Sequence, residues 1–172
     1  KKLALALGYL GRFQSFNNDV ATGKRHAEEG LQMARRCGDA ETLAGCLLRK
    51  AHSFEGWGMT ATQGLAYARE AADLRGKLTN NPTALADCLR FVAGATMDSD
   101  RAEAERLARE TLELDSKNLE PDHPSVVGAI FLLGQIQLDS GKFAEAEANL
   151  RETLRLHRKI YDPNHPHRFV VL

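Results

Sequence analysis

The chain has 172 residues, of which 43% are hydrophobic, enough for one globular domain or a short row of helical repeats. Its 23 basic and 23 acidic side chains cancel, which argues against a nucleic-acid partner, because nucleic-acid-binding domains usually carry a basic excess. No apolar run approaches the roughly 18–20 residues that cross a bilayer, which argues against a membrane partner.

The spacing of apolar residues predicts four pairs of helices. Ala, Leu, Glu and Arg dominate and β-branched residues are sparse, so strands are not expected. The five prolines lie outside the helical patterns, in positions typical of helix starts. The expected helices span 2–16 and 20–36, 40–56 and 60–77, 83–97 and 101–118, and 124–139 and 143–160, and a ninth begins near 166.

A duplication shows that these pairs repeat. Residues 102–124 recur at 144–166 with an offset of 42, and 13 of the 23 positions are identical. Chance would give roughly one or two identities, so the period indicates a repeat architecture. We therefore expect an all-α, right-handed α-solenoid of about four helix-turn-helix repeats, near 1–38, 39–81, 82–123 and 124–165. A further helix would start in 166–172, and the chain would be one segment of a longer protein.

The cysteines follow the same period. Cys46 and Cys88 lie 42 residues apart, and Ile130 occupies the next equivalent position, so we expect buried packing thiols rather than a redox pair. The absence of a CxxC pair favours a reducing compartment, and the predicted location is cytoplasmic.

Small residues recur where the two helices of each pair should cross. Two helices approach closely only where the side chains between them are small. Each pair has a Gly or Ala on both helices, at 11 to 13 residues' separation: Gly11 and Gly23, Ala51 and Gly64, Ala93 and Ala104, and Gly134 and Ala146.

This pattern resembles the tetratricopeptide repeat, in which a Gly or Ala on the first helix meets an Ala on the second. The last pair fits that motif at Leu133-Gly134, Gly141, Phe143, Ala146, Leu150 and Leu154. The boundary sequences EPDHP and DPNHP are similar to those of the 42-residue subtype found in kinesin light chains and in bacterial signalling proteins. The chain departs from the motif at Gln137, where Tyr is usual, and at Gly23, Gly30 and Gly64, where Ala is expected. A HEAT or armadillo array is the competing architecture.

Catalytic and metal-binding motifs are not evident in the sequence. His123, His165 and His167 raise the alternative of a zinc-dependent enzyme, but further ligands at suitable spacing are lacking, and the two His-Pro sequences are typical of a turn followed by a helix start. Glu105 and Arg109, like Glu147 and Arg151, predict i,i+4 ion pairs on solvated helix faces. We expect no enzyme activity, no cofactor and no metal.

The resemblance implies that the first helix of each pair lines a concave, partner-binding face. The matching positions are Arg12, Phe16, Leu48, Arg49, His52, Glu55, Arg90, Met97, Phe131 and Gln135. Arg12, Arg49 and Arg90 would form a basic stripe suited to an acidic peptide, or are ordinary solvated side chains.

The expected function is a non-catalytic scaffold that binds a protein or peptide. The alternative is a sensory or autoinhibitory repeat segment of a larger signalling enzyme, such as a bacterial kinase or an NTPase-linked regulator. Self-association through the C-terminal end is a further expectation, because Phe169, Val170, Val171 and Leu172 are apolar and would pack on the preceding hairpin or on a second chain.

Overall fold

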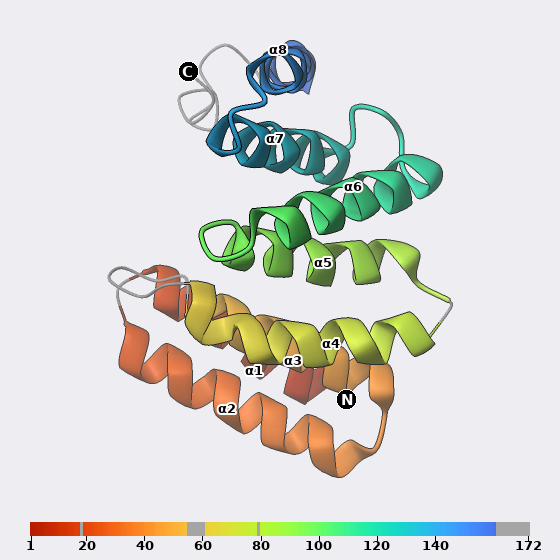
Figure 1. Ribbon diagram of the computed structural model, residues 1–172. Helices are drawn as coiled ribbons and strands as arrows, with labels where there is room; N and C mark the ends of the chain where they lie inside the picture. Colours follow the sequence, from red (N-terminus) through yellow and green to blue (C-terminus); the bar gives the residue numbers. More distant parts are fainter. Residues whose placement is uncertain (18, 55–60, 79, 161–172) are drawn as a thin grey trace. The chain divides into compact units, whose positions relative to one another are not determined.

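A computed structural model describes residues 1–17, 19–54, 61–78 and 80–160, and within these ranges all regular structure is helical (Figure 1). The helices are α1 (Lys2–Phe16), α2 (Val20–Cys37), α3 (Ala40–His52), the 3₁₀ turn η1 (Ala61–Gly64), α4 (Leu65–Lys77), α5 (Pro82–Thr96), α6 (Arg101–Asn118), α7 (Pro124–Asp139) and α8 (Phe143–Ile160). The expected helix pairs are therefore confirmed in the described residues.

Two helix boundaries differ from the sequence prediction. Helix α3 ends at His52 rather than at 56, and in its last turn the Ser53 hydroxyl donates to the carbonyl of Lys50 at 2.7 Å. The following helix is preceded by η1, so α4 itself begins at Leu65 rather than at 60. The helix expected from 166 lies outside the described residues.

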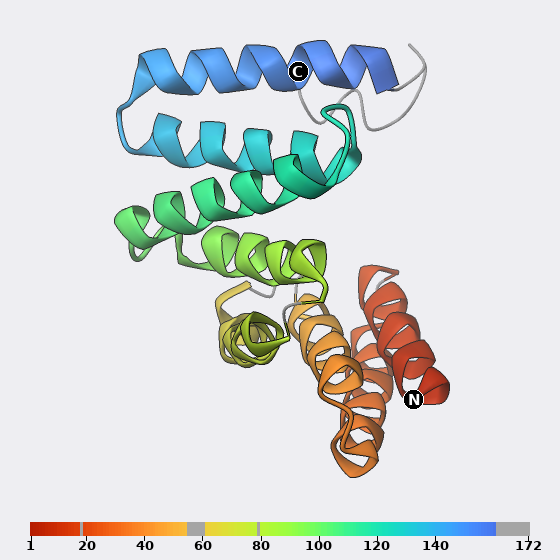
Figure 2. The same cartoon turned by 90° about the vertical axis from the view of Figure 1, so that its right-hand side faces the viewer.

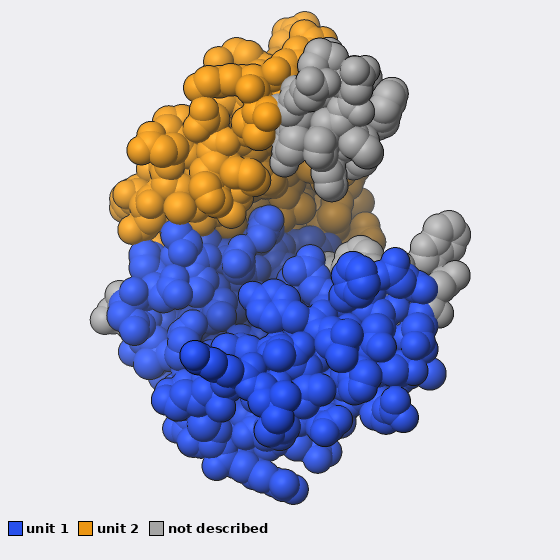
Figure 3. Space-filling view, turned by 180° about the vertical axis from the view of Figure 1, so that it is seen from behind, with its two compact units in different colours: residues 1–95 blue, residues 96–172 orange. Residues whose placement is uncertain are grey.

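The chain divides into two compact units, residues 1–95 and 96–172 (Figure 3). Unit 1 contains α1 to α4 and nearly all of α5, and unit 2 contains α6 to α8. Within the units, α1 lies along α2, α3 along α4 and α7 along α8 (Figures 1 and 2).

In unit 1, glycine residues lie where the two helices of each hairpin approach most closely. A Cβ added to Gly11 of α1 would lie 2.6 Å from the carbonyl oxygen of Gly23 and 2.7 Å from the backbone nitrogen of Ala27, both on α2. A Cβ on Gly64 would lie 2.6 Å from the carbonyl oxygen of Ala51. These backbones are in contact, which confirms the first two predicted crossings.

The hairpin of unit 2 closes differently. A Cβ on Gly134 of α7 would lie 3.1 Å from both Cγ and Cδ2 of Leu150 on α8, so Leu150 occupies the space that the glycine leaves. Ala146, the predicted partner, is buried one turn away with 1% of its surface exposed. Ala93 and Ala104, of the remaining predicted crossing, are both buried but belong to different units.

A buried carboxylate joins consecutive helices of unit 2. Glu105 of α6 is 9% exposed, and its two oxygens accept hydrogen bonds of 2.7 Å from Lys142, in the α7–α8 turn, and from Arg109. Arg109 also donates to Glu145 of α8 at 3.1 Å. The predicted i,i+4 pair exists, but the prediction of a solvated face was wrong for Glu105, because the next hairpin covers it.

Gln137, one of the residues that depart from the repeat motif, extends this network. Gln137 of α7 is 1% exposed; its amide nitrogen donates to Glu145 at 2.8 Å and its amide oxygen accepts from Asn149 at 2.7 Å. A buried amide needs both kinds of partner, and here α8 supplies both.

In unit 1, buried lysine and arginine side chains join neighbouring helices. Lys50 of α3 is 6% exposed, with its Nζ 3.2 Å from a Glu28 oxygen and donating to the Lys24 carbonyl at 3.3 Å, both on α2. Arg75 of α4 is 7% exposed and donates to the carbonyl of Ala84 on α5 at 2.5 Å. Each cation links a helix to its neighbour, and the stem of the side chain fills the core.

The two cysteines of the repeat period are free and buried, as predicted for packing thiols. Burial raises the pKa of Cys88 to about 11, although the nearby Arg75 opposes the shift. Ile130, in the next equivalent position, is half-buried.

We expect Gly11→Ala to lower the free energy of unfolding by about 1–3 kcal/mol, because the added methyl group meets backbone atoms that cannot move independently. Gly76→Ala in α4 is the matched control: no atom lies within 4 Å of the place that the new Cβ would take, and alanine favours a helix by up to about 1 kcal/mol. Urea unfolding followed by circular dichroism measures both. Equal stabilities would contradict the close crossing.

We expect Glu105→Gln to destabilise the protein by about 1–2 kcal/mol at neutral pH, because a charged acceptor of two hydrogen bonds is lost. Glu113→Gln on the same helix, which breaks an exposed pair with Lys117, should cost less than about 0.5 kcal/mol. Denaturant unfolding of the two variants gives the comparison.

The effect of Glu105 should depend on pH. The hydrogen bond from Lys142, and then that from Arg109, lower the pKa of Glu105 in the folded protein. The carboxylate therefore stabilises the fold fully above about pH 5, and this contribution is lost as the pH falls through the folded-state pKa. The stability difference between wild type and Glu105→Gln should shrink on acidification; a difference that stays constant to low pH would be inconsistent with the ion pairs.

Candidate docking patch on α1 and α3

The predicted site residues fall into both units. Unit 1 contains Arg12, Phe16, Leu48, Arg49, His52, Glu55 and Arg90, and unit 2 contains Met97, Phe131 and Gln135. Glu55 lies outside the described residues, and Phe16 is the last residue of α1.

Leu48 differs from the others because it belongs to the core. It is 1% exposed and is among the largest fully buried side chains. It therefore has no surface to offer a partner. The equivalent position one period later is Arg90, which is half-buried, so the same repeat position does not have the same burial in each hairpin.

Arg49 lies where α3 packs on α1. A Cβ on Gly8 of α1 would approach the Arg49 Cβ to 3.2 Å, so the arginine stem lies directly against the α1 backbone. The guanidinium carbon is 4.1 Å from the centroid of the Tyr9 ring, and Nη2 donates to the Tyr9 hydroxyl at 2.5 Å. Stacking and hydrogen bonding together hold this arginine in one orientation.

Beside this pair, α1 has a shallow hollow of about 430 Å³ lined by Tyr9, Arg12, Phe13 and Asn17. Tyr9 is 53% exposed and Phe13 67% exposed, which is high for aromatic side chains. Arg12 is half-buried. We call Tyr9, Arg12, Phe13 and Arg49 the α1–α3 patch.

His52 and Arg90, two further predicted residues of unit 1, contact neighbours within the fold. The His52 ring packs edge-on against Phe91, with ring centroids 4.9 Å apart. Arg90 forms a 2.6 Å ion pair with Asp87 on its own helix, which offsets its charge. Of the three arginines of the predicted stripe, Arg12 lines the hollow on α1 and Arg49 contacts Tyr9 at its edge.

In unit 2, Phe131 and Gln135 lie half-buried on α7, and Met97 is half-buried just after the end of α5. These residues include one thioether, one aromatic ring and one amide, and none carries charge. Their position on or next to a first helix of a hairpin agrees with the motif, but the chemistry of the α1–α3 patch is more distinctive.

The first His-Pro sequence is a helix cap. His123 Nδ1 accepts a hydrogen bond from the Ser125 backbone nitrogen at 3.1 Å, and Pro124 opens α7. This confirms the turn-and-cap prediction for that copy. His165, Pro166 and His167 lie outside the described residues. Among the residues that are described, no group of three or more His, Cys, Asp and Glu side chains could hold a metal ion.

Sequence reasoning missed Tyr9 and Phe13. A signal was available, because Tyr9 and Phe13 are spaced by one helical turn on α1, and Arg12 lies on the same side of the helix. The motif directs attention to the residues that flank the small crossing position, and it does not report which of them a neighbouring helix leaves exposed.

Comparison with known proteins gives a family match and two structural matches. Residues 90–159 match the sequence model of the tetratricopeptide repeat family. A variant of a Podosopora anserina protein assigned as a kinesin light chain, with nearly identical TPR-like repeats, is similar in structure, with a TM-score of 0.76 and 18% identity. A second structure of these repeats, which is not the variant, gives a TM-score of 0.74 and 17% identity.

Both comparisons cover 96% of this chain and 80% of the other. At these identities the likeness concerns the fold alone, and it confirms the predicted all-α repeat solenoid. No curated protein matches the sequence. No described helix is long and apolar enough to cross a membrane.

Proposed function

Because residues 90–159 match the sequence model of the tetratricopeptide repeat family, whose repeats generally mediate protein–protein interaction, we propose that this protein is a non-catalytic scaffold. Its partner is a peptide segment of another protein, and the α1–α3 patch binds it. The patch lies on the first helices of the first two hairpins, the helices that the motif assigns to the concave face.

The observation that carries this proposal is the pairing of Arg49 with Tyr9 beside the exposed Phe13. An arginine already fixed by a ring loses little freedom when it binds a carboxylate, so more of the interaction energy appears as affinity. Aromatic and arginine side chains also dominate the binding energy of protein interfaces.

The chemistry of the patch indicates the kind of peptide. The Arg49 guanidinium, held beside Tyr9, favours a carboxylate as its ligand. The exposed rings of Tyr9 and Phe13 favour an apolar side chain one or two residues away along the peptide. The expected ligand is an acidic residue next to a large aliphatic or aromatic one.

The patch would also serve the alternative considered from the sequence, a sensory or autoinhibitory segment of a signalling enzyme, because such a segment acts by binding as well. The two functions share the ligand chemistry and differ in whether a catalytic domain is encoded in the same gene.

We expect the intact chain to bind members of an immobilised array of short peptides in which Asp or Glu stands next to Leu or Phe. Arg49→Glu and Tyr9→Ala should each weaken binding at least tenfold, because they remove the carboxylate partner and the ring that orients it. Fluorescence anisotropy with the best array peptide measures the dissociation constants.

Arg25→Glu is the matched control, because Arg25 is exposed on α2 and the substitution changes the net charge equally. Circular dichroism checks that each variant is folded. If the array shows no binding, or if Arg49→Glu and Arg25→Glu weaken binding equally, the proposed patch is incorrect.

A further inference from the structure

Gly8 lies buried in the interior of α1, a place where glycine weakens a helix. The crossing of α1 and α2 does not require it, because the atoms nearest to an added Cβ belong to α3. They are Cβ of Arg49 at 3.2 Å and Cγ of Arg49 at 3.3 Å. The reason for a glycine at this position is therefore found in α3.

The repeat does not demand a glycine here either. Gly11 and Ala51 are the crossing residues of the first two hairpins, so Gly8 of α1 corresponds to Leu48 of α3. Leu48 is 1% exposed and fills the core with a large side chain. At the same position the first hairpin has no side chain, and the stem of an arginine lies there instead.

Helix α1 has little room to move away from this arginine. A Cβ on Gly30 of α2 would lie 3.1 Å from the Gly8 nitrogen and 2.7 Å from the Ala4 carbonyl oxygen. The backbone of α2 thus touches the same turn of α1, and α1 contacts both α2 and α3. A methyl group at position 8 would therefore displace the stem of Arg49 rather than the helix.

The position of the stem determines where the charge lies. The guanidinium carbon of Arg49 is 4.1 Å from the centroid of the Tyr9 ring, and Nη2 donates to the Tyr9 hydroxyl. Arg49 Nε is buried, so a carboxylate can reach the guanidinium only at its Nη end. Tyr9 directly follows Gly8, so one short piece of backbone carries both the contact with the stem and the ring beneath the charge.

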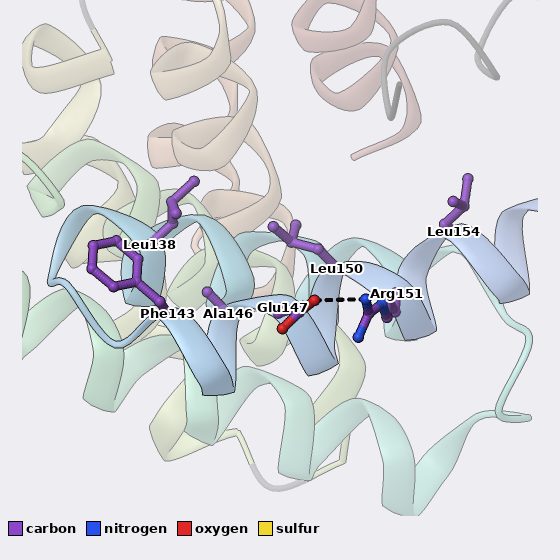
Figure 4. A pocket seen from close by; sticks show the side chains of 7 residues that line it. All are labelled: Leu138, Phe143, Ala146, Glu147, Leu150, Arg151 and Leu154. Carbon is purple, nitrogen blue, oxygen red and sulfur yellow. Dashed lines mark ion pairs between the residues drawn. The ribbon is translucent and has the colours of Figure 1, made fainter.

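The groove on α8 shows an arginine that lacks this support. The groove, about 450 Å³ in volume, is lined mainly by apolar side chains, with Arg151 beside them (Figure 4). Arg151 pairs at 2.6 Å with Glu147 of its own helix, and its side chain is 75% exposed. Orientation by a second helix thus distinguishes Arg49 from an arginine that simply lies beside a groove.

We propose that Gly8 is the positioning residue of the α1–α3 patch. Because Gly8 has no side chain, the stem of Arg49 can lie against α1, and this places the guanidinium over Tyr9 at the edge of the hollow. The inference rests on the proposed function, in which Arg49 binds the carboxylate of the peptide. Gly8 acts through Arg49 and does not touch the peptide itself.

The first test is binding of the best array peptide, measured by fluorescence anisotropy with the intact chain. Gly8→Ala should weaken binding about fivefold or more, because the displaced guanidinium must be reordered when the peptide binds. Gly76→Ala is the matched control and should bind as wild type does, since no atom lies within 4 Å of its added Cβ.

A double-mutant cycle separates placement of Arg49 from a general structural role. In an Arg49→Ala background, Gly8→Ala should change the affinity by less than about twofold, because the group to be placed is absent. If Gly8→Ala weakens binding equally in both backgrounds, the proposal is wrong.

Nuclear magnetic resonance measures the placement of Arg49 without a peptide. The ring current of Tyr9 should shift the side-chain proton resonances of Arg49, and Tyr9→Leu gives their unshifted positions. Gly8→Ala should move these resonances towards the Tyr9→Leu positions, whereas Gly76→Ala should leave them unchanged.

Unchanged resonances in Gly8→Ala would overturn the proposal. Loss of the fold in Gly8→Ala, seen by circular dichroism, would also overturn it, because the glycine would then be needed for folding rather than for placing one side chain. If the resonances move as expected but wild type binds no array peptide, the proposed function fails while the placement of Arg49 by Gly8 stands. The two failures are therefore distinguishable.

Discussion

The structure depends on how closely the two helices of a hairpin approach. Where Gly11 meets Gly23, and where Ala51 meets Gly64, backbone touches backbone, so almost no apolar surface is buried between the helices at those points. Such a hairpin has little core of its own. Its remaining apolar residues must be covered by the next hairpin, and stability therefore comes from joints between neighbours.

Polar contacts at these joints determine which residues face each other. Apolar side chains tolerate small slips along a helix, but a buried Glu105 requires Lys142 and Arg109 at hydrogen-bonding distance, and Gln137 requires both Glu145 and Asn149. In unit 1, Lys50 and Arg75 impose the same kind of requirement with long cations. The charged residues of this neutral chain thus serve partly as markers of register.

Most of the fold was predictable because its signals can be read directly from the sequence. They are the apolar spacing, stop residues such as Gly38, and the repeat with a period of 42 residues. The predictions that were wrong concern burial, which depends on helices that are distant in the sequence and that the apolar spacing does not identify. Glu105 is buried because a later hairpin covers it, and Leu48 is core although the equivalent Arg90 is half-buried. Arg12 and Arg49 were identified by motif position, whereas Tyr9 and Phe13 stand out only once their exposure is known.

The recurrence of Glu105 and Arg109 as Glu147 and Arg151 has a consequence for how such a chain can change in length. An added hairpin with a cation in the position of Lys142 and an acid in the position of Glu145 could pair with Glu147 and Arg151 in the same way. Duplication of the 42-residue segment that forms α7 and α8 would therefore repeat the joint between α6 and this hairpin with the same chemistry. Length is then a property that evolution, or a protein engineer, can alter by counting units, with no redesign of the parts.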